Sequence, residues 1–159
     1  MNPHEASQLI DRLGDAFAAA DVERVMSMFA AEGDVIYDGS EPGEVAFGQP
    51  AMRVLLTDLF SRHERYSWRC DSVRSVTCAA GVIVLADVTL FIAEAAAAET
   101  GDGSHHSSGT APYRVSGLLE NSTEGWRWRF CHGSEPAYAD TDPTQRRADP
   151  LGASHPAAV

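Results

Sequence analysis

A segment near the C-terminal end alternates between aromatic and basic side chains, and it carries the first candidate for chemistry. In residues 125–134, GWRWRFCHGS, three aromatic rings and then His132 fall on one parity, and two arginines and a cysteine fall on the other. This period of two predicts a β-strand with two different faces. An aromatic face that ends in a histidine is typical of a pocket wall, where an imidazole can move protons near neutral pH. His132 is therefore the first candidate site residue, with an ordinary packing histidine as the alternative.

A lone carboxylate gives the second candidate. Asp87 is the only ionisable residue in the apolar segment 82–93. Burying such a carboxylate is costly, so Asp87 either faces water or is retained for a purpose. An apolar site would push it toward its neutral form, in which it could donate a hydrogen bond to an oxyanion. Arg114 offers the alternative, because a nearby guanidinium would keep Asp87 charged in a structural ion pair.

The composition excludes several classes of function. The net charge is −11, and all twelve basic residues are scattered arginines, so we expect no nucleic-acid partner. Without lysine, neither a Schiff base nor a lysine general base can operate. No apolar run approaches the roughly 18 residues of a membrane span, so we expect no membrane partner.

The cysteines and histidines give no sign of a metal centre. Cys70, Cys78 and Cys131 are odd in number and have no Cys-x-x-Cys spacing, which favours reduced thiols in a cytoplasmic protein. The pair His105 and His106 lacks acidic or cysteine partners at ligand spacing. We therefore expect no metal and no cofactor.

Three helices are expected before residue 64. Asn2, Pro3 and Glu5 are typical of a capped helix start and predict a helix that ends near residue 20. Asp21 can cap a second, shorter helix. A third helix begins after Gly48 and carries the most regular apolar stripe: Met52, Leu55, Leu56, Leu59, Phe60 and His63.

Strands follow the helices, and the whole suits one domain over residues 1–136. Turn residues between alternating or apolar segments predict short strands at 34–38 and 45–47 and long strands at 66–78, 82–93, 113–121 and 125–134. The composition predicts a mobile hairpin connection at 95–112 and a disordered tail at 137–159. Gly-Ser-Glu-Pro occurs at 39–42 and again at 133–136; we interpret this repeat as coincidence.

This order predicts an α+β fold: a curved antiparallel β-sheet with three N-terminal helices packed on its concave face, forming an open cone. The chain resembles the nuclear transport factor 2-like superfamily, in its SnoaL-like, ketosteroid-isomerase-type branch, over about residues 5–136. The resemblance rests on VMSMFAAEG at 25–33, on the helix start at 48–52 and on the closing strand at 125–134. It implies a cystatin-like α+β barrel with a pocket in the cone.

The resemblance also implies positions for catalytic groups. Ketosteroid isomerases of this superfamily place a general-base Asp in the strand after helix two, which falls on Tyr37 or, with a one-residue slip, on Asp38. Their oxyanion-hole tyrosine falls near Leu13, which cannot donate, and Tyr113 and Arg114 lie where their second acid would be. The resemblance to the epoxide hydrolases of the superfamily implies an Asp–Arg–Asp arrangement. Asp87 and Arg114 would supply two of its three members.

Two functions follow from this interpretation. The first is a small cofactor-independent enzyme that performs acid–base chemistry, such as isomerisation, cyclisation, dehydration or epoxide opening, on a hydrophobic or polycyclic metabolite. The alternative is a non-catalytic binding or dimerisation module, and a homodimer is expected through the sheet face that carries Arg127 and Arg129. The expected catalytic residues are His132, Asp87, Asp38, Tyr37 and Arg114, and the expected ligand-binding residues are Trp68, Phe60, Tyr113, Trp128, Phe130 and His63.

Overall fold

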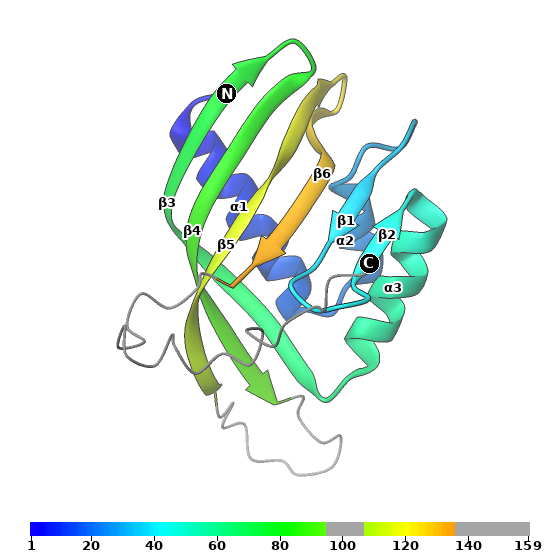
Figure 1. The fold of residues 1–159 in the computed structure, drawn as a ribbon, viewed down its shortest axis with the longest axis vertical. Helices are drawn as coiled ribbons and strands as arrows, with labels where there is room; N and C mark the ends of the chain where they lie inside the picture. The colour runs from blue at the N-terminus through cyan, green and yellow to red at the C-terminus, as the bar shows by residue number, and fades with distance from the viewer. Residues whose placement is uncertain (95–106, 136–159) are drawn as a thin grey trace, which may run out of the picture.

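A six-stranded, curved and unclosed sheet forms the body of the protein (Figure 1). The structure is a computed structural model that describes residues 1–94 and 107–135. The strand order is β2-β1-β6-β5-β4-β3, and only the β1–β6 pair is parallel among the described strands. This confirms the predicted α+β class. The strands are β1 (Ile36–Asp38), β2 (Val45–Phe47), β3 (Glu64–Cys78), β4 (Gly81–Glu94), β5 (Ser107–Ser122) and β6 (Gly125–Ser134).

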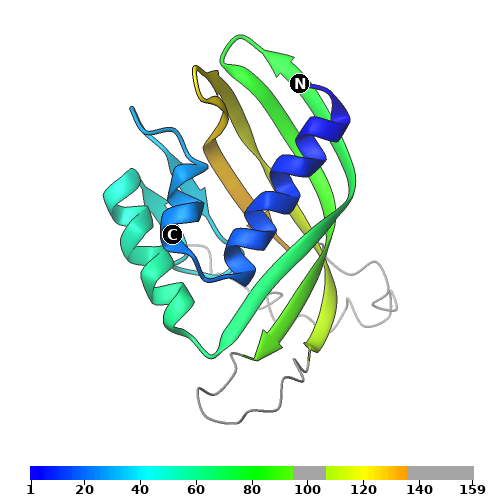
Figure 2. The ribbon, with the colours of Figure 1, turned by 180° about the vertical axis from the view of Figure 1, so that it is seen from behind.

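Three helices begin where their capping residues predict. Helix α1 (Pro3–Ala18) starts with a capping box, in which the Asn2 and Glu5 side chains each accept a hydrogen bond from the other's backbone N–H. Asp21 caps α2 (Val22–Ser27), and α3 (Gln49–Ser61) follows Gly48. Helix α1 crosses the sheet, whereas α2 and α3 lie beside β1 and β2 (Figure 2). The helices therefore cover one face of the sheet.

The connection between β4 and β5 is shorter than the sequence predicted. Strand β5 begins at Ser107, so residues 107–112, expected to be part of a mobile hairpin, are strand. They pair with the C-terminal half of β4, for example Ala111 with Leu90, because β4 extends to Glu94 and supplies the ladder. Residues 95–106, which include the histidine pair, and the predicted tail at 137–159 lie outside the described residues.

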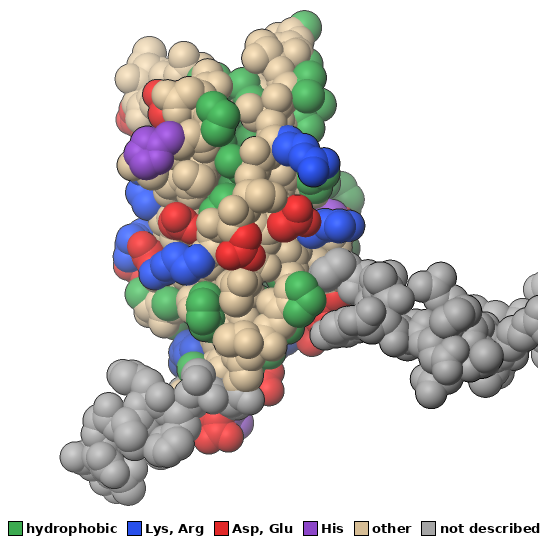
Figure 3. Space-filling view, turned by 90° about the vertical axis from the view of Figure 1, so that its left-hand side faces the viewer, with side chains coloured by type: hydrophobic (Ala, Val, Ile, Leu, Met, Phe, Trp, Pro, Cys, Tyr) green, Lys and Arg blue, Asp and Glu red, His purple; other side chains and the backbone are tan. Residues whose placement is uncertain are grey.

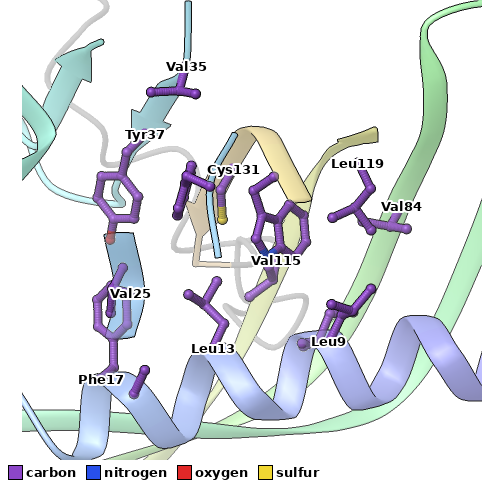
Figure 4. Close-up of a cluster of buried hydrophobic side chains, with 14 of the residues drawn as sticks. Leu9, Leu13, Phe17, Val25, Val35, Tyr37, Val84, Val115, Leu119 and Cys131 are labelled. Atoms are coloured by element: carbon purple, nitrogen blue, oxygen red, sulfur yellow. The ribbon is translucent and has the colours of Figure 1, made fainter. Parts of the chain in front are cut away.

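The core lies between α1 and the inner face of the sheet. Leu9, Leu13 and Phe17 project from α1 toward strand side chains such as Val115 (Figure 4). Helix α1 approaches β3 closely at Gly14, where any Cβ would overlap the backbone of the strand at Trp68. No helix among residues 1–94 and 107–135 is long and apolar enough to cross a membrane.

Strand β6 contains a bulge that decides which of its side chains reach the core. Phe130 pairs with Leu118, but Trp128 pairs with Leu119, so Arg129 has no partner across the ladder. Trp128 is fully buried. After the extra residue the alternation shifts by one, as a bulge requires.

The bulge corrects the prediction that all four residues of the aromatic parity share one face. Beyond Arg129, the buried positions are Cys131 and Gly133, whereas Phe130 and His132 lie on the outer face with their rings stacked, 6.4 Å between centroids. Trp128 and His132 therefore point to opposite sides of the sheet. The single pocket wall expected along this strand does not exist.

Candidate functional site

A cavity of about 240 Å³ lies between the inner face of the sheet and the helices, at the end of the sheet where β3 begins. Its aromatic and aliphatic walls come from α1, α3 and four strands, β1, β3, β4 and β5. Its other polar groups come from the β1–β2 connection, the start of β3 and the residue after β6. The lining residues are Phe17, Tyr37, Ser40, Glu41, Glu44, Leu59, Glu64, Tyr66, Trp68, Leu90, Ile92, Tyr113 and Glu135.

Tyr37 is the most deeply placed hydroxyl of the cavity. Its side chain extends from β1 toward Phe17 of α1 (Figure 4) and is only 8% exposed. No residue that the structure describes forms a hydrogen bond with its hydroxyl group. Burial raises the pKa of Tyr37 well above its ordinary value, and the nearby Glu44 adds to the shift. The hydroxyl therefore stays protonated and is free to bind a group that enters the cavity.

Tyr113 supplies a second hydroxyl from β5. A Cβ at Gly133 would overlap the tyrosine oxygen, so only glycine at that position of β6 lets the hydroxyl lie where it does. Burial raises the pKa of Tyr113 to about 12, although a hydrogen bond with Ser40 acts in the opposite direction. Tyr113 is thus a second neutral donor on the same cavity.

Glu44 brings a buried carboxylate to the cavity. It is 7% exposed, and its Oε1 accepts a hydrogen bond of 2.9 Å from Nη1 of Arg62. A Cβ at Gly39 would overlap its carboxylate, and the Gly39 N–H donates to the Glu44 carbonyl at 2.7 Å. The same guanidinium of Arg62 lies 3.6 Å from Glu41. One arginine therefore serves two cavity carboxylates.

Three of the residues expected at the site line the cavity: Tyr37, Trp68 and Tyr113. Trp68 is 5% exposed, donates from Nε1 to the Ile10 carbonyl at 3.0 Å and packs against Phe17. Its ring is therefore a fixed wall rather than a mobile cover.

Several expected ligand-binding residues lie elsewhere. Phe60 sits behind the cavity wall, with its ring edge-on to Phe17 at 5.2 Å. Trp128 is enclosed in the core. Helix α3 ends at Ser61, so His63 no longer belongs to its apolar stripe and is exposed, contrary to the prediction.

Two expected catalytic residues meet, but outside the cavity. His132 Nδ1 lies 3.0 Å from Oδ2 of Asp38, because β1 and β6 pair in parallel with these residues in register. The orientation does not give Nδ1 a regular hydrogen bond. Both side chains are about one third exposed on the outer face. The expectation that this acid–base pair borders the apolar cavity is therefore wrong, because of the bulge at Arg129.

Asp87 and Arg114 also lie on the outer face. Arg114 Nε donates to Asp87 at 3.1 Å, and both side chains are about half exposed. The Arg114 guanidinium, and next the Ser72 hydroxyl, hold the pKa of Asp87 below its ordinary value. On the side where β3 lies, acidic and basic side chains lie near one another on the surface (Figure 3). Asp87 is thus an ion-paired surface carboxylate, and the neutral, oxyanion-binding form considered from the sequence is wrong.

The repeated Gly-Ser-Glu-Pro segments mark the site that sequence reasoning missed. The first begins directly after β1 and the second begins with the last two residues of β6, and these two strands run parallel and end side by side. Each supplies a glutamate to the cavity, Glu41 from the first and Glu135 from the second. Each glycine also makes room for a cavity group, as described for Glu44 and Tyr113. The interpretation of this repeat as coincidence overlooked the sequence feature that marks both ends of the cavity rim.

The described residues offer little for a metal. Among residues 1–94 and 107–135, no three His, Cys, Asp or Glu side chains are placed to hold an ion. Cys131 is buried, and burial raises the pKa of its thiol to about 12. The groups available for chemistry in the cavity are therefore hydroxyls and carboxylates.

Comparison with known families gives one match. The sequence profile of the SnoaL-like domain matches residues 6–138. A comparison with curated proteins finds no match.

Solved structures give many matches to the fold. A proposed aromatic ring hydroxylase from Novosphingobium aromaticivorans is 16% identical with a TM-score of 0.65, covering 87% of this chain and 94% of that one. A proposed dehydratase of the NTF2-like family from Streptomyces avermitilis is 14% identical with a TM-score of 0.62, covering 85% and 96%. An NTF2-like superfamily protein from Salmonella enterica is 16% identical with a TM-score of 0.63, covering 88% and 94%. At these identities the likeness shows the fold alone.

Proposed function

Because this chain belongs to the SnoaL-like domain family, we propose that it is a cofactor-independent enzyme for acid–base chemistry on a small, largely apolar molecule. The observation that carries the proposal is the hydroxyl of Tyr37, which is protonated and has no hydrogen-bond partner among the described residues. Tyr37 lines the same cavity as Tyr113 and Glu44. A structural neighbour described as a proposed dehydratase is consistent with such chemistry. Isomerisation, cyclisation, dehydration and epoxide opening all include a proton transfer of this kind.

Glu44, Tyr37 and Tyr113 could together catalyse an enolisation, which needs a base for the proton on carbon and hydrogen-bond donors for the oxygen. Glu44 would accept a proton from carbon, and the electron pair of the broken C–H bond would move onto a carbonyl oxygen. Tyr37 and Tyr113 would donate hydrogen bonds to that oxygen as its negative charge develops. Their raised pKa values keep both donors protonated over the neutral range.

Deuterium exchange into 2-tetralone tests this chemistry without knowledge of the natural substrate. The bicyclic ketone has acidic protons beside its carbonyl, and NMR in D₂O follows their replacement. The protein should accelerate exchange above the buffer rate. Glu44→Gln should lower the protein-catalysed rate by about 100-fold, as should Tyr37→Phe, in keeping with the loss of a general base or an oxyanion donor.

Outer-face variants provide the matched controls. His132→Ala and Asp87→Asn remove ionisable groups that do not line the cavity, so the exchange rate should stay within about twofold of the native rate. A native rate equal to buffer, or a rate that falls only in the outer-face variants, would remove the proposal.

An apolar row across the outer face favours a second role, as a homodimer interface. The row is continuous through the ladder, one residue from each strand in register: Phe47, Ile36, Phe130, Leu118, Ile83 and Val76. Phe47 is 70% and Val76 65% exposed. An apolar row that crosses all six strands forms a larger continuous apolar surface than single scattered residues do, and such a surface is typical of an interface. A two-fold axis would bring the rows of two chains together. Arg129, expected at this interface, is instead paired with Glu120 of its own chain.

Sedimentation velocity at micromolar concentration tests the dimer. The native chain should sediment as a dimer, and Ile83→Glu should sediment as a monomer, because it places a charge in the middle of the row. Val54→Glu is the control, since Val54 is 72% exposed but lies on α3 rather than on the sheet. A native monomer would contradict the interface.

A further inference from the structure

The cavity has a strongly one-sided charge. Four of its lining residues are glutamates, at positions 41, 44, 64 and 135, and its lining as described contains no arginine or histidine. Arg62 is the nearest counterion, and it is shared by Glu41, Glu44 and Asp58. The guanidinium of Arg65 is engaged by the backbone carbonyls of Arg62 and Glu64. The carboxylates therefore outnumber the cations that neutralise them.

The charge is arranged in depth. Phe17, Tyr37 and Trp68 are each no more than 8% exposed, whereas Glu41, Glu64 and Glu135 are exposed at the rim. Glu44 lies between these levels, buried but on the cavity wall. A molecule that enters would thus place one end among aromatic rings and the other among carboxylates.

The pKa values of the cavity tyrosines reflect the same negative charge. Burial raises the pKa of Tyr113, and the negative charges of Glu44 and Glu135 act in the same direction. The pKa of Tyr66 is raised by burial, by its hydrogen bond to Glu64, and by the charges of Glu41 and Glu44. Negative charge that disfavours a phenolate also disfavours any anionic ligand.

We propose that the ligand of this cavity is a cation, an amine-bearing molecule with a ring or other apolar body. Its protonated nitrogen lies among Glu44 and the rim carboxylates, and its apolar body lies against Trp68 and Phe17. Aromatic rings also attract cations through their faces, so the walls and the rim select the same charge. The unpartnered hydroxyl of Tyr37 binds a polar atom at the inner end. This inference rests on the proposed function, since it names the ligand class of the same site.

Three naphthalene probes that differ in charge test it. We would titrate the full chain with 1-naphthylmethylamine, 1-naphthalenemethanol and 1-naphthoate by calorimetry at neutral pH. The amine should bind at least about tenfold more tightly than the alcohol, and the carboxylate should bind most weakly. Added salt should weaken the binding of the amine and leave the binding of the alcohol unchanged.

Variants assign the preference to the cavity. Glu44→Gln should lower amine affinity about tenfold and leave alcohol affinity unchanged, and Glu64→Gln at the exposed rim gives the same test if the first variant does not fold. Glu32→Gln is the control, because Glu32 is exposed and does not line this cavity.

Equal binding of amine and alcohol, or tighter binding of naphthoate, would overturn the cation inference. It would leave the proposed function intact, because 2-tetralone is neutral and its exchange does not depend on the rim charge. Failure of all three probes to bind would overturn the inference too, and the ketone exchange would then decide the proposed function separately. An equal loss of amine affinity in Glu32→Gln would show a general charge effect rather than a site.

Discussion

The two faces of the sheet use their ionisable groups differently. On the outer face, His132 meets Asp38 and Asp87 meets Arg114, all between about one third and one half exposed. On the inner side, Tyr37 of β1 and Glu44 of the β1–β2 connection are more than nine-tenths buried around a cavity. Solvent weakens interactions on the first face, whereas burial shifts pKa values and leaves a hydroxyl unpaired on the second.

The difference shows that residue type is a poor guide to the site in this chain. The sequence interpretation assigned catalysis to His132, Asp87, Asp38 and Arg114 as well as to Tyr37, because such side chains are common in catalysis. Of these five only Tyr37 lines the cavity, whose other polar groups include Tyr113 and glutamates, together with glycines that leave room for them. The side of the strand on which a residue lies decides what it can do.

The largest expected difference between the faces is in stability. Trp68→Ala would remove a buried ring that packs on Phe17 and donates to the Ile10 carbonyl, so the free energy of unfolding should fall by about 3–5 kcal/mol. Phe47→Ala on the outer face should change it by no more than about 0.5 kcal/mol. Urea unfolding measures both, at a dilution where the chain is monomeric. Equal losses would mean that the outer ring is as well packed as the inner one.

Most of the fold could be predicted from the sequence because its signals are local. Asn2 and Asp21 cap helices through contacts with residues three positions away. The alternation of β5 holds as predicted, with Val115 and Leu119 buried and Arg114 exposed. This pattern survives folding because β5 pairs with β4 without interruption from Tyr113 to Leu119.

Tyr37, Trp68 and Tyr113 were predicted to belong to the site, and they line the cavity. The rest of the site could not be predicted, because its geometry depends on contacts between distant segments. Arg129 is held in the bulge by the Glu120 carboxylate and by the carbonyls of Glu32 and Asp34. Nothing within residues 125–134 marks which of them is the extra one. Glu44 is likewise placed by Arg62, eighteen positions away. Only the repeated Gly-Ser-Glu-Pro sequence hinted that two distant segments share one edge.

A smaller effect is expected at the glycine that makes room for Tyr113. Gly133→Ala would force the phenol ring to move, so we expect a loss of about 1–3 kcal/mol in the free energy of unfolding and slower exchange of 2-tetralone. Gly109→Ala in β5 is the matched control, because open space surrounds that position and no loss is expected. Native behaviour of Gly133→Ala would show that the tyrosine position is not fixed by this contact.

Tyrosine ionisation tests the burial of the inner side without a mutation, because Tyr37, Tyr66 and Tyr113 all line the cavity. Tyr37, Tyr66 and Tyr113 all have raised pKa values, so at about pH 11 the folded chain should show far less tyrosinate absorbance than the chain in denaturant. The folded state then binds more protons than the unfolded state, and stability falls as the pH rises above about 10. Matching absorbance in the folded and denatured chain would mean that the cavity is open to water.

The smallest effect is expected for the outer ion pair, and it has the opposite pH dependence. Asp87→Asn removes a half-exposed contact with Arg114, so the melting temperature at neutral pH should fall by no more than about 3 °C. The pKa of Asp87 is lowered in the folded state, so its contribution is present above the unfolded pKa and is lost as the pH falls through the lowered value. The difference between native and variant chains should therefore vanish in strong acid and shrink in high salt. Thermal unfolding followed by circular dichroism at both pH values measures it. A large loss at neutral pH would mean that Asp87 is shielded from water in the protein in solution, as it would be if the homodimer interface extended over this part of the outer face.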